Sequence, residues 1–261
     1  MYAFEIERPG TIADAVKALS TDEAQPLGGG QTLIPTLKQR LAMPSVLVSL
    51  TAIPEMRGIC TDDAGRLCIG GGTIHADIAG VDGFAGLSSM AARIGDPAVR
   101  NRGTIGGSLA NNDPSACYPA AALAAGAIIM TDRREIAADD YFQGMFDTAL
   151  EEGEIVTEVR FPVPQKSAYA KFEQPASRFA LVGVFVAQFS DSVRVAVTGA
   201  SESGVFRWTE AEDALAGSFA PEAIDGLSLA ADGMMGDLHG TPEYRAHLVG
   251  VMTRRAVAAA S

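Results

Sequence analysis

Two glycine-rich segments constrain the fold of this chain more than any other feature. The first, Gly28-Gly29-Gly30, follows the apolar pair Pro26-Leu27 and leads into Gln31 and Thr32, where a helix is expected to begin. Glycines allow a tight turn with positive φ, while a helix start directs unpaired N–H groups and the positive end of the helix dipole at the loop. The helix start favours a phosphate or pyrophosphate site over a simple turn.

The residues after these glycines exclude two common nucleotide-binding patterns. A P-loop needs Gly-Lys-Ser/Thr, whereas this loop continues Gly30-Gln31-Thr32 and lacks the phosphate-binding lysine. The dinucleotide pattern GxGxxG fails because Leu33 takes the place of the third glycine. A further triplet, Gly70-Gly71-Gly72, fails the same test at His75. Neither P-loop ATP hydrolysis nor an ordinary NAD-binding fold is supported.

The second glycine-rich segment carries more polar side chains. Residues 103–114 read Gly-Thr-Ile-Gly-Gly-Ser-Leu-Ala-Asn-Asn-Asp-Pro. Thr104 and Ser108 can donate hydrogen bonds to phosphate oxygens, while Asn111, Asn112 and Asp113 can bond ribityl or ribose hydroxyls. Asn-Asp-Pro by itself predicts an Asx turn, which is the simpler interpretation of Asp113. Two such loops predict one extended ligand held from both sides.

The hydrophobic pattern predicts strands and helices in alternation, with shorter strands and tighter turns from about residue 58. Hairpins are expected at Asp62–Gly65 and around Asp191, and a domain boundary near Pro164 to Lys166. An irregular binding loop is expected from Gly95 to Pro119. Strands are expected at 2–7, 45–50, 66–70, 127–131, 154–162, 180–188 and 192–200. Helices are expected at 32–42, 73–79, 86–94 and 119–125, and a further helix is expected to begin at Thr11, which acts as its cap. A helical tail is expected from about 210 to 259, with breaks at Gly217, Gly236 and Gly240.

Composition narrows the partners. A net charge of −12 disfavours nucleic acid and anionic membrane surfaces. The longest small-apolar stretch, Ala120 to Met130, is far shorter than the ~20 residues of a membrane span, and the N-terminus lacks the features of a secretory signal. The three cysteines, Cys60, Cys68 and Cys117, form no CxxC pair. They argue against a disulfide framework, a zinc site or an iron–sulfur cluster in this chain, and they indicate a reducing cytoplasm.

A few single residues leave alternatives open. His75 could lie beside a cofactor, although a structural position at a helix start is the simpler interpretation. Arg100 and Arg102 flank the second loop and could equally neutralise a pyrophosphate or face solvent. The Glu151-Glu152 run is interpreted as a solvated turn, and no nucleophile–base pair or metal-ligand cluster is found.

Both loops are similar to those of a known family. The chain resembles the FAD-binding medium subunit of the xanthine dehydrogenase family, specifically of carbon monoxide dehydrogenase-like molybdenum hydroxylases. That subunit's loops read approximately Ala-Gly-Gly-His-Ser-Leu-Ile-Pro and Thr-Ile-Gly-Gly-Asp, which correspond here to residues 28–35 and 104–108. The similarity continues through Lys38–Pro44, Ile69–Ile78, Asp113-Pro114 and Lys171–Arg178, and so spans nearly the whole chain.

The resemblance implies an α+β fold. A vanillyl-alcohol-oxidase-type FAD-binding domain of two α/β lobes is expected at 1–165, with lobes at about 1–57 and 58–165. A C-terminal flavoprotein domain with a small antiparallel sheet and helices is expected at 166–261. No residue of this chain is assigned a catalytic or metal-binding role. The cofactor-binding residues that the resemblance implies are Gly28, Gly29, Gly30, Gln31, Thr32, Leu33, Ile94, Thr104, Ile105, Gly106, Gly107, Ser108, Asn111, Asp113, Cys117 and Val156.

The resemblance also implies partners. A large subunit would hold molybdopterin and a small subunit two [2Fe–2S] clusters, in a dimer of heterotrimers. Electrons would pass from the molybdenum through the clusters to FAD in this chain, and then to an acceptor such as NAD or a quinone. Two alternatives are a stand-alone flavin-dependent oxidoreductase and a non-catalytic family member that acts in assembly.

Three departures from the family pattern are visible. The family usually has an aspartate three residues after the Asp-Pro pair, where this chain has Cys117. If that carboxylate accepts a hydrogen bond from the ribityl chain, Cys117 is a weaker substitute. Gln31 replaces a common histidine, and the C-terminal domain is short.

Overall fold

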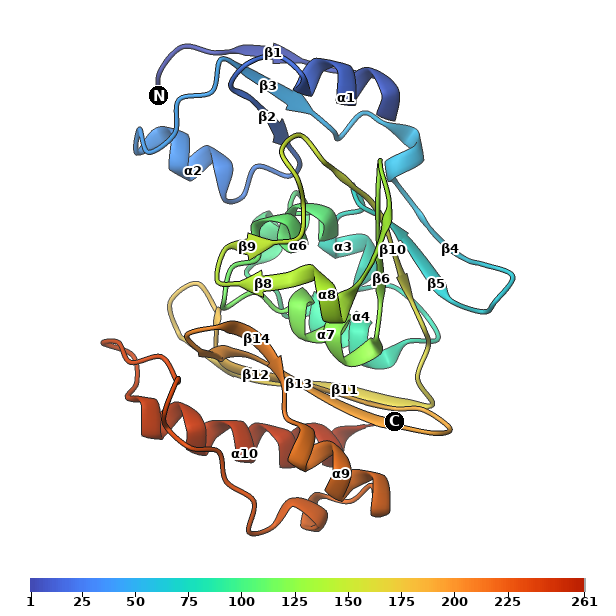
Figure 1. The fold of residues 1–261 in the computed structure, drawn as a ribbon, viewed down its shortest axis with the longest axis vertical. Coiled ribbons are helices and arrows are strands. Elements are labelled where there is room, and N and C mark those ends of the chain that lie inside the picture. The colour runs from blue at the N-terminus through green and yellow to red at the C-terminus, as the bar shows by residue number, and fades with distance from the viewer. Residues whose placement is uncertain (261) are drawn as a thin grey trace.

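Three sheets are stacked along the long axis of the molecule. The computed structural model describes residues 1–260. Figure 1 shows an N-terminal lobe at the top, a central lobe of sheet and helices, and a C-terminal sheet with one long and one shorter helix at the bottom. Each layer has a buried apolar cluster, and the central cluster also takes in side chains of the C-terminal sheet such as Tyr169 and Phe185. The α+β class predicted for the chain is confirmed.

The N-terminal lobe is a parallel sheet with two short helices. Thr11 begins the first helix as predicted, since its hydroxyl accepts a hydrogen bond from the Asp14 amide. One strand was not predicted because its sequence Ala-Gln-Pro-Leu has no β-branched residue. Its Pro26 is tolerated because the strand lies at the sheet edge. The elements are β1 (Glu5–Glu7), α1 (Ile12–Leu19), β2 (Ala24–Leu27), α2 (Leu33–Lys38) and β3 (Val46–Ser49), with sheet order β1-β3-β2.

The helix expected at 32–42 is shorter than predicted. It ends at Lys38, and two residues later Arg40 adopts a left-handed conformation with φ 60°. This conformation cannot continue a right-handed helix. Leu41, which falls beyond the shortened helix, is 74% exposed.

The central lobe is built on a five-stranded antiparallel sheet. The predicted turn at Asp62–Gly65 is confirmed, with the Gly65 amide bonded to the Asp62 carbonyl at 2.9 Å and a positive φ at Gly65. The sheet order is β4-β5-β10-β6-β7. The elements are η1 (Pro54–Met56), β4 (Ile59–Thr61), β5 (Leu67–Gly70), α3 (His75–Ile78), α4 (Ala85–Ala92), α5 (Pro97–Arg100), α6 (Ile105–Asn111), α7 (Tyr118–Ala125), β6 (Ile128–Thr131), β7 (Glu135–Ala137), α8 (Ala138–Tyr141), β8 (Phe142–Gly144), β9 (Asp147–Thr148) and β10 (Val156–Phe161).

The irregular loop expected from Gly95 to Pro119 was wrong. The segment holds α5, α6 and the start of α7. Glycine and asparagine have low helix propensity, but tertiary packing overrides it here. In α6 the side chains of Ile105 and Leu109 are fully buried, and the backbone of Gly106 lies against that of Gly71.

The C-terminal sheet lies between two groups of helices. α4 and α7 pack on one side of it, and α9 and α10 lie on the other (Figure 1). The hairpin predicted around Asp191 is confirmed, whereas the predicted helical tail is interrupted, since residues 225–241 form no helix. The elements are β11 (Lys166–Glu173), β12 (Ala180–Gln188), β13 (Val193–Ser201), β14 (Gly204–Arg207), α9 (Thr209–Gly217), η2 (Pro221–Ile224) and α10 (Pro242–Ala259).

No helix within residues 1–260 has the length and apolar character needed to cross a bilayer.

Candidate functional site

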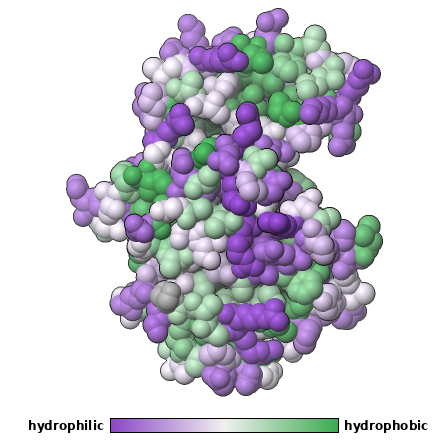
Figure 2. Space-filling model, turned by 180° about the vertical axis from the view of Figure 1, so that it is seen from behind, coloured by the Kyte–Doolittle hydropathy of each residue, from purple (hydrophilic) through white to green (hydrophobic). Residues whose placement is uncertain are grey.

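A cavity of about 700 Å³ lies between the N-terminal and central lobes. In the space-filling view the molecule is hollowed beneath the N-terminal lobe (Figure 2). Both glycine-rich loops line the cavity, so the structure brings together most of the residues singled out in the sequence. Those lining it are Gly28, Gly29, Gly30, Gln31, Thr32, Leu33, Thr104, Gly106, Gly107, Ser108, Asn111, Asp113 and Val156, whereas Ile94, Ile105 and Cys117 do not line it.

The first loop lines the cavity and keeps its backbone amides free of partners within the described part of the chain. The six consecutive N–H groups of residues 28–33 make no hydrogen bond to any acceptor within residues 1–260. The first bonded amide is that of Ile34, which donates to the Gly30 carbonyl at 3.1 Å. Gly30 has φ 72°, which bends the chain ahead of α2. A row of free N–H groups on a glycine turn is a site for an anion.

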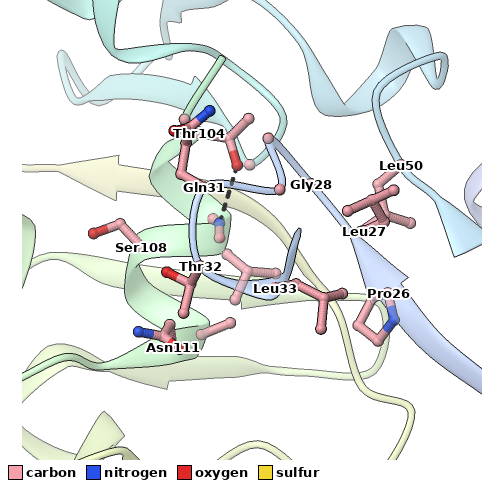
Figure 3. A pocket seen from close by; sticks show the side chains of 18 of the residues that line it. Pro26, Leu27, Gly28, Gln31, Thr32, Leu33, Leu50, Thr104, Ser108 and Asn111 are labelled. Atoms are coloured by element: carbon pink, nitrogen blue, oxygen red, sulfur yellow. Dashed lines mark hydrogen bonds between the residues drawn. The ribbon is translucent and has the colours of Figure 1, made fainter. Parts of the chain in front are cut away.

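The second loop uses its amides within the fold. The Ile105 amide donates to the Thr73 carbonyl at 3.1 Å and the Gly106 amide to the Gly71 carbonyl at 2.8 Å. Thr104 is the N-cap of α6, and its Oγ1 accepts from the Gly107 amide at 3.1 Å, drawn as the dashed line in Figure 3. These donors are satisfied before any ligand binds, so residues 105–107 offer no row of free amides like that of the first loop.

The second loop offers side chains instead. Thr104, Ser108 and Asn111 lie along one side of α6, next to the first loop (Figure 3). The side chains of Ser108 and Asn111 make no hydrogen bond within the described part of the chain, and the same holds for Gln31 and Thr32 of the first loop. These four polar groups are therefore free to bond hydroxyl or phosphate oxygens of a ligand.

A third glycine run, at residues 70–72, packs against the second loop and the strand β10, while the first loop packs directly on the second. A Cβ atom on Gly71 would overlap the Val156 carbonyl oxygen, and one on Gly106 would lie 2.6 Å from the Gly71 oxygen. A Cβ atom on Gly29 would overlap the Arg102 carbonyl oxygen. These three glycines are required because backbone packs directly on backbone. In the sequence, Gly70-Gly71-Gly72 could be compared only with nucleotide-binding motifs, and nothing there indicated that these glycines pack against backbone.

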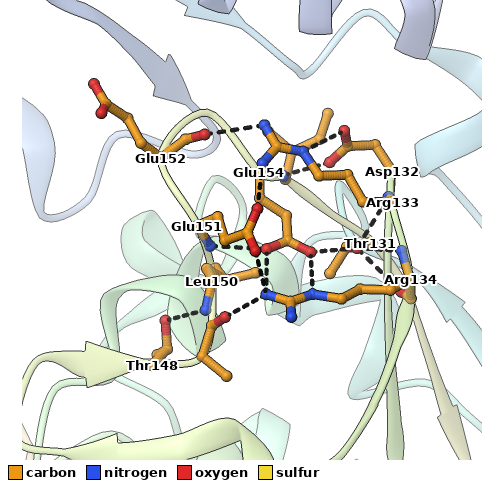
Figure 4. A network of polar contacts seen from close by, with 11 residues as sticks. Thr131, Asp132, Arg133, Arg134, Thr148, Leu150, Glu151, Glu152 and Glu154 are labelled. Atoms are coloured by element: carbon orange, nitrogen blue, oxygen red, sulfur yellow. Dashed lines mark hydrogen bonds and ion pairs between the residues drawn. The ribbon is translucent and has the colours of Figure 1, made fainter.

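A polar network supports the cavity wall at Glu154, a residue that was not singled out in the sequence. Its carboxylate accepts hydrogen bonds from the Arg134 side chain (3.0 Å), the Thr131 hydroxyl (2.7 Å) and the Glu151 amide (2.8 Å), as Figure 4 shows. Burial alone would raise the pKa of Glu154, but these hydrogen bonds and the Arg134 charge lower it to about 2. Glu154 is thus an ionised structural group and no general base at neutral pH.

Asn112 and Asp113 have local structural contacts. Buried Asn112 donates to the Gly144 and Asp147 carbonyls at 2.7 and 2.8 Å, so it fixes the β8–β9 hairpin and is not free for a ribityl chain as expected. Asp113 accepts from the Ser115 amide at 2.8 Å, which is the predicted Asx turn, and it also lines the cavity.

Cys117 is buried next to Lys171. The Lys171 ammonium donates to the Arg93 and Arg178 carbonyls at 2.7 and 2.8 Å, and its nitrogen lies 3.9 Å from the Cys117 sulfur. The neighbouring Ser115 and Ala116 line the cavity, whereas Cys117 does not. The substitution therefore lies behind the cavity wall, against a buried cation.

The residues flanking the second loop differ in their environments. Arg100 donates to the Ile94 and Gly95 carbonyls at 3.1 and 3.0 Å, and Arg102 is exposed. Within residues 1–260, no lysine or arginine lines the cavity. His75 does line it, although it is only 5% exposed, and its burial together with the nearby Arg100 charge lowers its pKa to about 4.

Comparison with known proteins identifies this architecture. The sequence model of the family described as "FAD binding domain in molybdopterin dehydrogenase" matches residues 2–164. The nicotine 6-hydroxylase medium subunit of Paenarthrobacter nicotinovorans is 36% identical over 98% of this chain and 96% of its own length. The carbon monoxide dehydrogenase medium chain of Hydrogenophaga pseudoflava is 32% identical over the same shares.

Solved structures agree with the sequence matches. A chain of the carbon monoxide dehydrogenase from Hydrogenophaga pseudoflava superposes with a TM-score of 0.88, covering 99% of this chain and 97% of that chain at 32% identity. A chain of quinoline 2-oxidoreductase from Pseudomonas putida 86 gives 0.85 at 28% identity and covers 98% of this chain and 96% of that one. Both the predicted family and the predicted fold are confirmed. The chain belongs to the FAD-binding medium subunits of the xanthine dehydrogenase and carbon monoxide dehydrogenase-like molybdenum hydroxylases, and is an oxidoreductase subunit.

Proposed function

We propose that this chain binds one FAD in the cavity between its lobes and passes electrons from [2Fe–2S] clusters of a partner subunit, through the FAD, to an external acceptor such as NAD or a quinone. The single observation that carries the binding site is the row of six free amides at residues 28–33. A dinucleotide diphosphate presents oxygen acceptors that such a row can satisfy.

The remaining lining fits the other parts of FAD. Free hydroxyl and amide groups on Gln31, Thr32, Ser108 and Asn111 suit the ribityl and ribose hydroxyls. Apolar groups line the same cavity and suit the flat ring systems. These apolar side chains are Leu27, Leu33, Leu50, Met56, Ile155, Val156 and Phe179.

The ionisable groups of the cavity favour a relay over an enzyme with its own organic substrate. Its two carboxylates, Asp113 and Glu154, are both engaged in hydrogen bonds to the chain. The bound flavin would supply the redox chemistry, while the chain binds and orients it. Turnover of an organic donor by the isolated chain would favour the alternative of a stand-alone oxidoreductase.

Partners and domains complete the proposal. The relatives are named as medium chains or subunits of enzymes acting on different compounds, carbon monoxide and nicotine among them. This supports a complex in which a large molybdopterin subunit selects the substrate and a small subunit holds the clusters, as a dimer of heterotrimers. We place the FAD-binding domain at 1–165 and the C-terminal domain at 166–261. The family match, which ends at residue 164, supports this boundary. The three free cysteines support a reducing, cytoplasmic location.

Purification of the chain with its native partners tests the function. We expect one FAD per chain, a molybdenum and iron content in the complex, and flavin bleaching when the complex is reduced by its substrate under anaerobic conditions. Reoxidation by NAD or a quinone identifies the acceptor. A complex whose chain neither retains FAD nor takes it up on titration would contradict the proposal, and a complex with FAD that its substrate does not reduce would contradict the relay alone.

A further inference from the structure

His75 has a setting that its position at a helix start does not explain. Nδ1 is sealed from solvent without a hydrogen-bond partner, and no hydrogen bond to either ring nitrogen is found within residues 1–260. A buried polar atom without a partner costs free energy, which marks the residue for a role beyond packing. Because His75 still lines the cavity, Nε2 is the nitrogen left to meet a ligand.

The neighbours of His75 place that nitrogen against Gly103 at the start of the second loop, with the first loop on the other side of Gly103. The His75 amide donates to the Gly103 carbonyl at 3.0 Å, and a Cβ atom on Gly103 would lie 2.5 Å from Nε2. A Cβ atom on Gly29 would lie 2.7 Å from Cα of Gly103. Gly103 is thus packed between His75 and Gly29 of the first loop. The free amides of that loop begin at Gly28, the residue before Gly29.

The charges of the cavity lining single out His75, since the cations Lys38 and Arg102 line a separate, smaller pocket against residues 28–31. The lining residues include two carboxylates and, within the described chain, no lysine or arginine. Any dinucleotide that bridges the two loops brings a doubly negative diphosphate into this lining. Among the described residues that line this cavity, His75 is the only one whose side chain can gain a positive charge.

We propose that the His75 ring takes up one proton from solvent when a dinucleotide diphosphate binds and so compensates part of its negative charge. Cofactor binding and ring protonation are then coupled. The inference rests on the proposed FAD site. In the free chain the ring is neutral, with one nitrogen protonated. In the complex both nitrogens carry a proton, and the ring faces the diphosphate as a cation.

The groups packed around His75 allow this change. Arg100 on α5 opposes protonation but is held by the Ile94 and Gly95 carbonyls. The Tyr118 ring on α7 lies 5.2 Å away, between centroids, and its hydroxyl is buried without a partner. Asp77 on the same helix is exposed, and α4 and α6 carry no charged residue. A diphosphate therefore supplies the negative charge that the surroundings lack, and a nearby opposite charge raises the pKa of a histidine from its free value of about 4.

The test is the pH dependence of binding by the full chain, with FAD and with ADP-ribose as a flavin-free dinucleotide diphosphate. We expect the dissociation constant of FAD to rise with pH, by up to tenfold per unit between the free and bound pKa values of His75. Calorimetry in buffers of different ionisation enthalpy is expected to show an uptake approaching one proton per FAD in the same range.

Two variants and a control separate the possible causes. His75→Phe keeps a ring against Tyr118, and His75→Gln keeps a hydrogen-bond donor. We expect both to bind FAD with no pH dependence, at least tenfold more weakly than the wild type at pH 5.5 and almost equally at high pH. His247→Gln, on the exposed side of α10, is expected to behave as wild type.

The outcomes distinguish this inference from the FAD assignment. Wild-type FAD binding that is flat with pH and takes up no proton would overturn the inference alone. Proton-coupled binding of ADP-ribose with no gain from the flavin would support the inference and contradict the FAD assignment. Variants weakened equally at every pH would reduce His75 to a structural role, and a chain that binds neither probe would overturn both proposals.

Discussion

The two glycine-rich loops look alike in sequence and use their backbones differently. The amides of residues 28–33, which line the cavity, have no partner within residues 1–260, whereas the amides of Ile105, Gly106, Gly107 and Ser108 are all bonded within the fold. A free N–H group can bind an anion, while a bonded one only maintains the chain conformation. We therefore propose the first loop as the anion site, while the second is a structural support that presents side chains.

This difference separates two reasons for having glycine. Gly30 adopts φ 72°, a turn conformation that other residues reach only with strain. Gly106 sits inside α6 with no positive φ, and it is needed because the Gly71 backbone leaves no room for a side chain. A glycine motif by itself does not tell ligand approach from backbone packing.

The largest expected effect comes from filling this packed contact. Gly106→Ala places a Cβ atom 2.6 Å from the Gly71 oxygen. Because both partners are backbone, relief requires moving α6, and we expect a loss of about 3 kcal/mol in the free energy of unfolding. Urea denaturation measures it. Gly10→Ala is the control, with nothing within 4 Å of its new Cβ atom and an expected change under about 0.5 kcal/mol. Equal stability of the two variants would show that the glycine is not needed for packing.

How far the sequence predicts this fold depends on whether the signal is local. Thr11, the Asp62–Gly65 turn and the Asp191 hairpin were predicted because each is specified by neighbouring residues. β2 and α6 were missed because tertiary pairing and packing stabilise segments of poor propensity. For α6, the N-cap Thr104 three residues before Gly107 is the one local signal that could have revealed the helix start.

In the candidate site, too, the features specified by neighbouring residues were predicted and those that depend on tertiary contacts were not. The loops were found because glycine and hydroxyl residues cluster in the sequence, and the resemblance added Val156 from a distant strand. Glu154 and the role of His75 were not predicted, since each depends on partners from other elements, such as Arg134 and Gly103. Residues that become hydrogen-bond partners only through folding are not separated by a characteristic spacing, so the sequence alone does not reveal them.

The second-largest expected effect concerns Glu154, which holds the part of the cavity wall against which Gly71 packs. Gly71 packs on the Val156 carbonyl, and Glu154 anchors the chain entering that strand. Since the pKa of Glu154 is about 2 in the folded chain and ordinarily near 4.5, its stabilisation is present above pH 4.5 and is lost as pH falls toward 2. We expect about 2–3 kcal/mol from this group. Thermal unfolding from pH 7 to 2.5 measures the loss.

Glu154→Gln provides the comparison for that titration. The variant keeps the side-chain size but loses the charge that Arg134 meets. We expect it to be less stable than the wild type at pH 7 and nearly equal to it near pH 2.5. A constant difference at all pH values would mean that Glu154 contributes through packing alone.

The smallest expected effect compares two threonines in equivalent positions. Thr104 and Thr32 are the N-cap residues of α6 and α2, but only the Thr104 side chain accepts a capping hydrogen bond. We expect Thr104→Ala to lower the free energy of unfolding by about 1 kcal/mol. Thr32→Ala is expected to leave stability within about 0.5 kcal/mol and to weaken FAD binding by roughly fivefold, since a hydrogen bond to a ligand is worth about 1 kcal/mol. Chemical denaturation and FAD titration on both variants measure these effects, with Thr61→Ala, at an exposed position outside the cavity, as the control. If Thr32→Ala destabilises the free chain as much as Thr104→Ala does, the two loops share one structural role and the distinction between them fails.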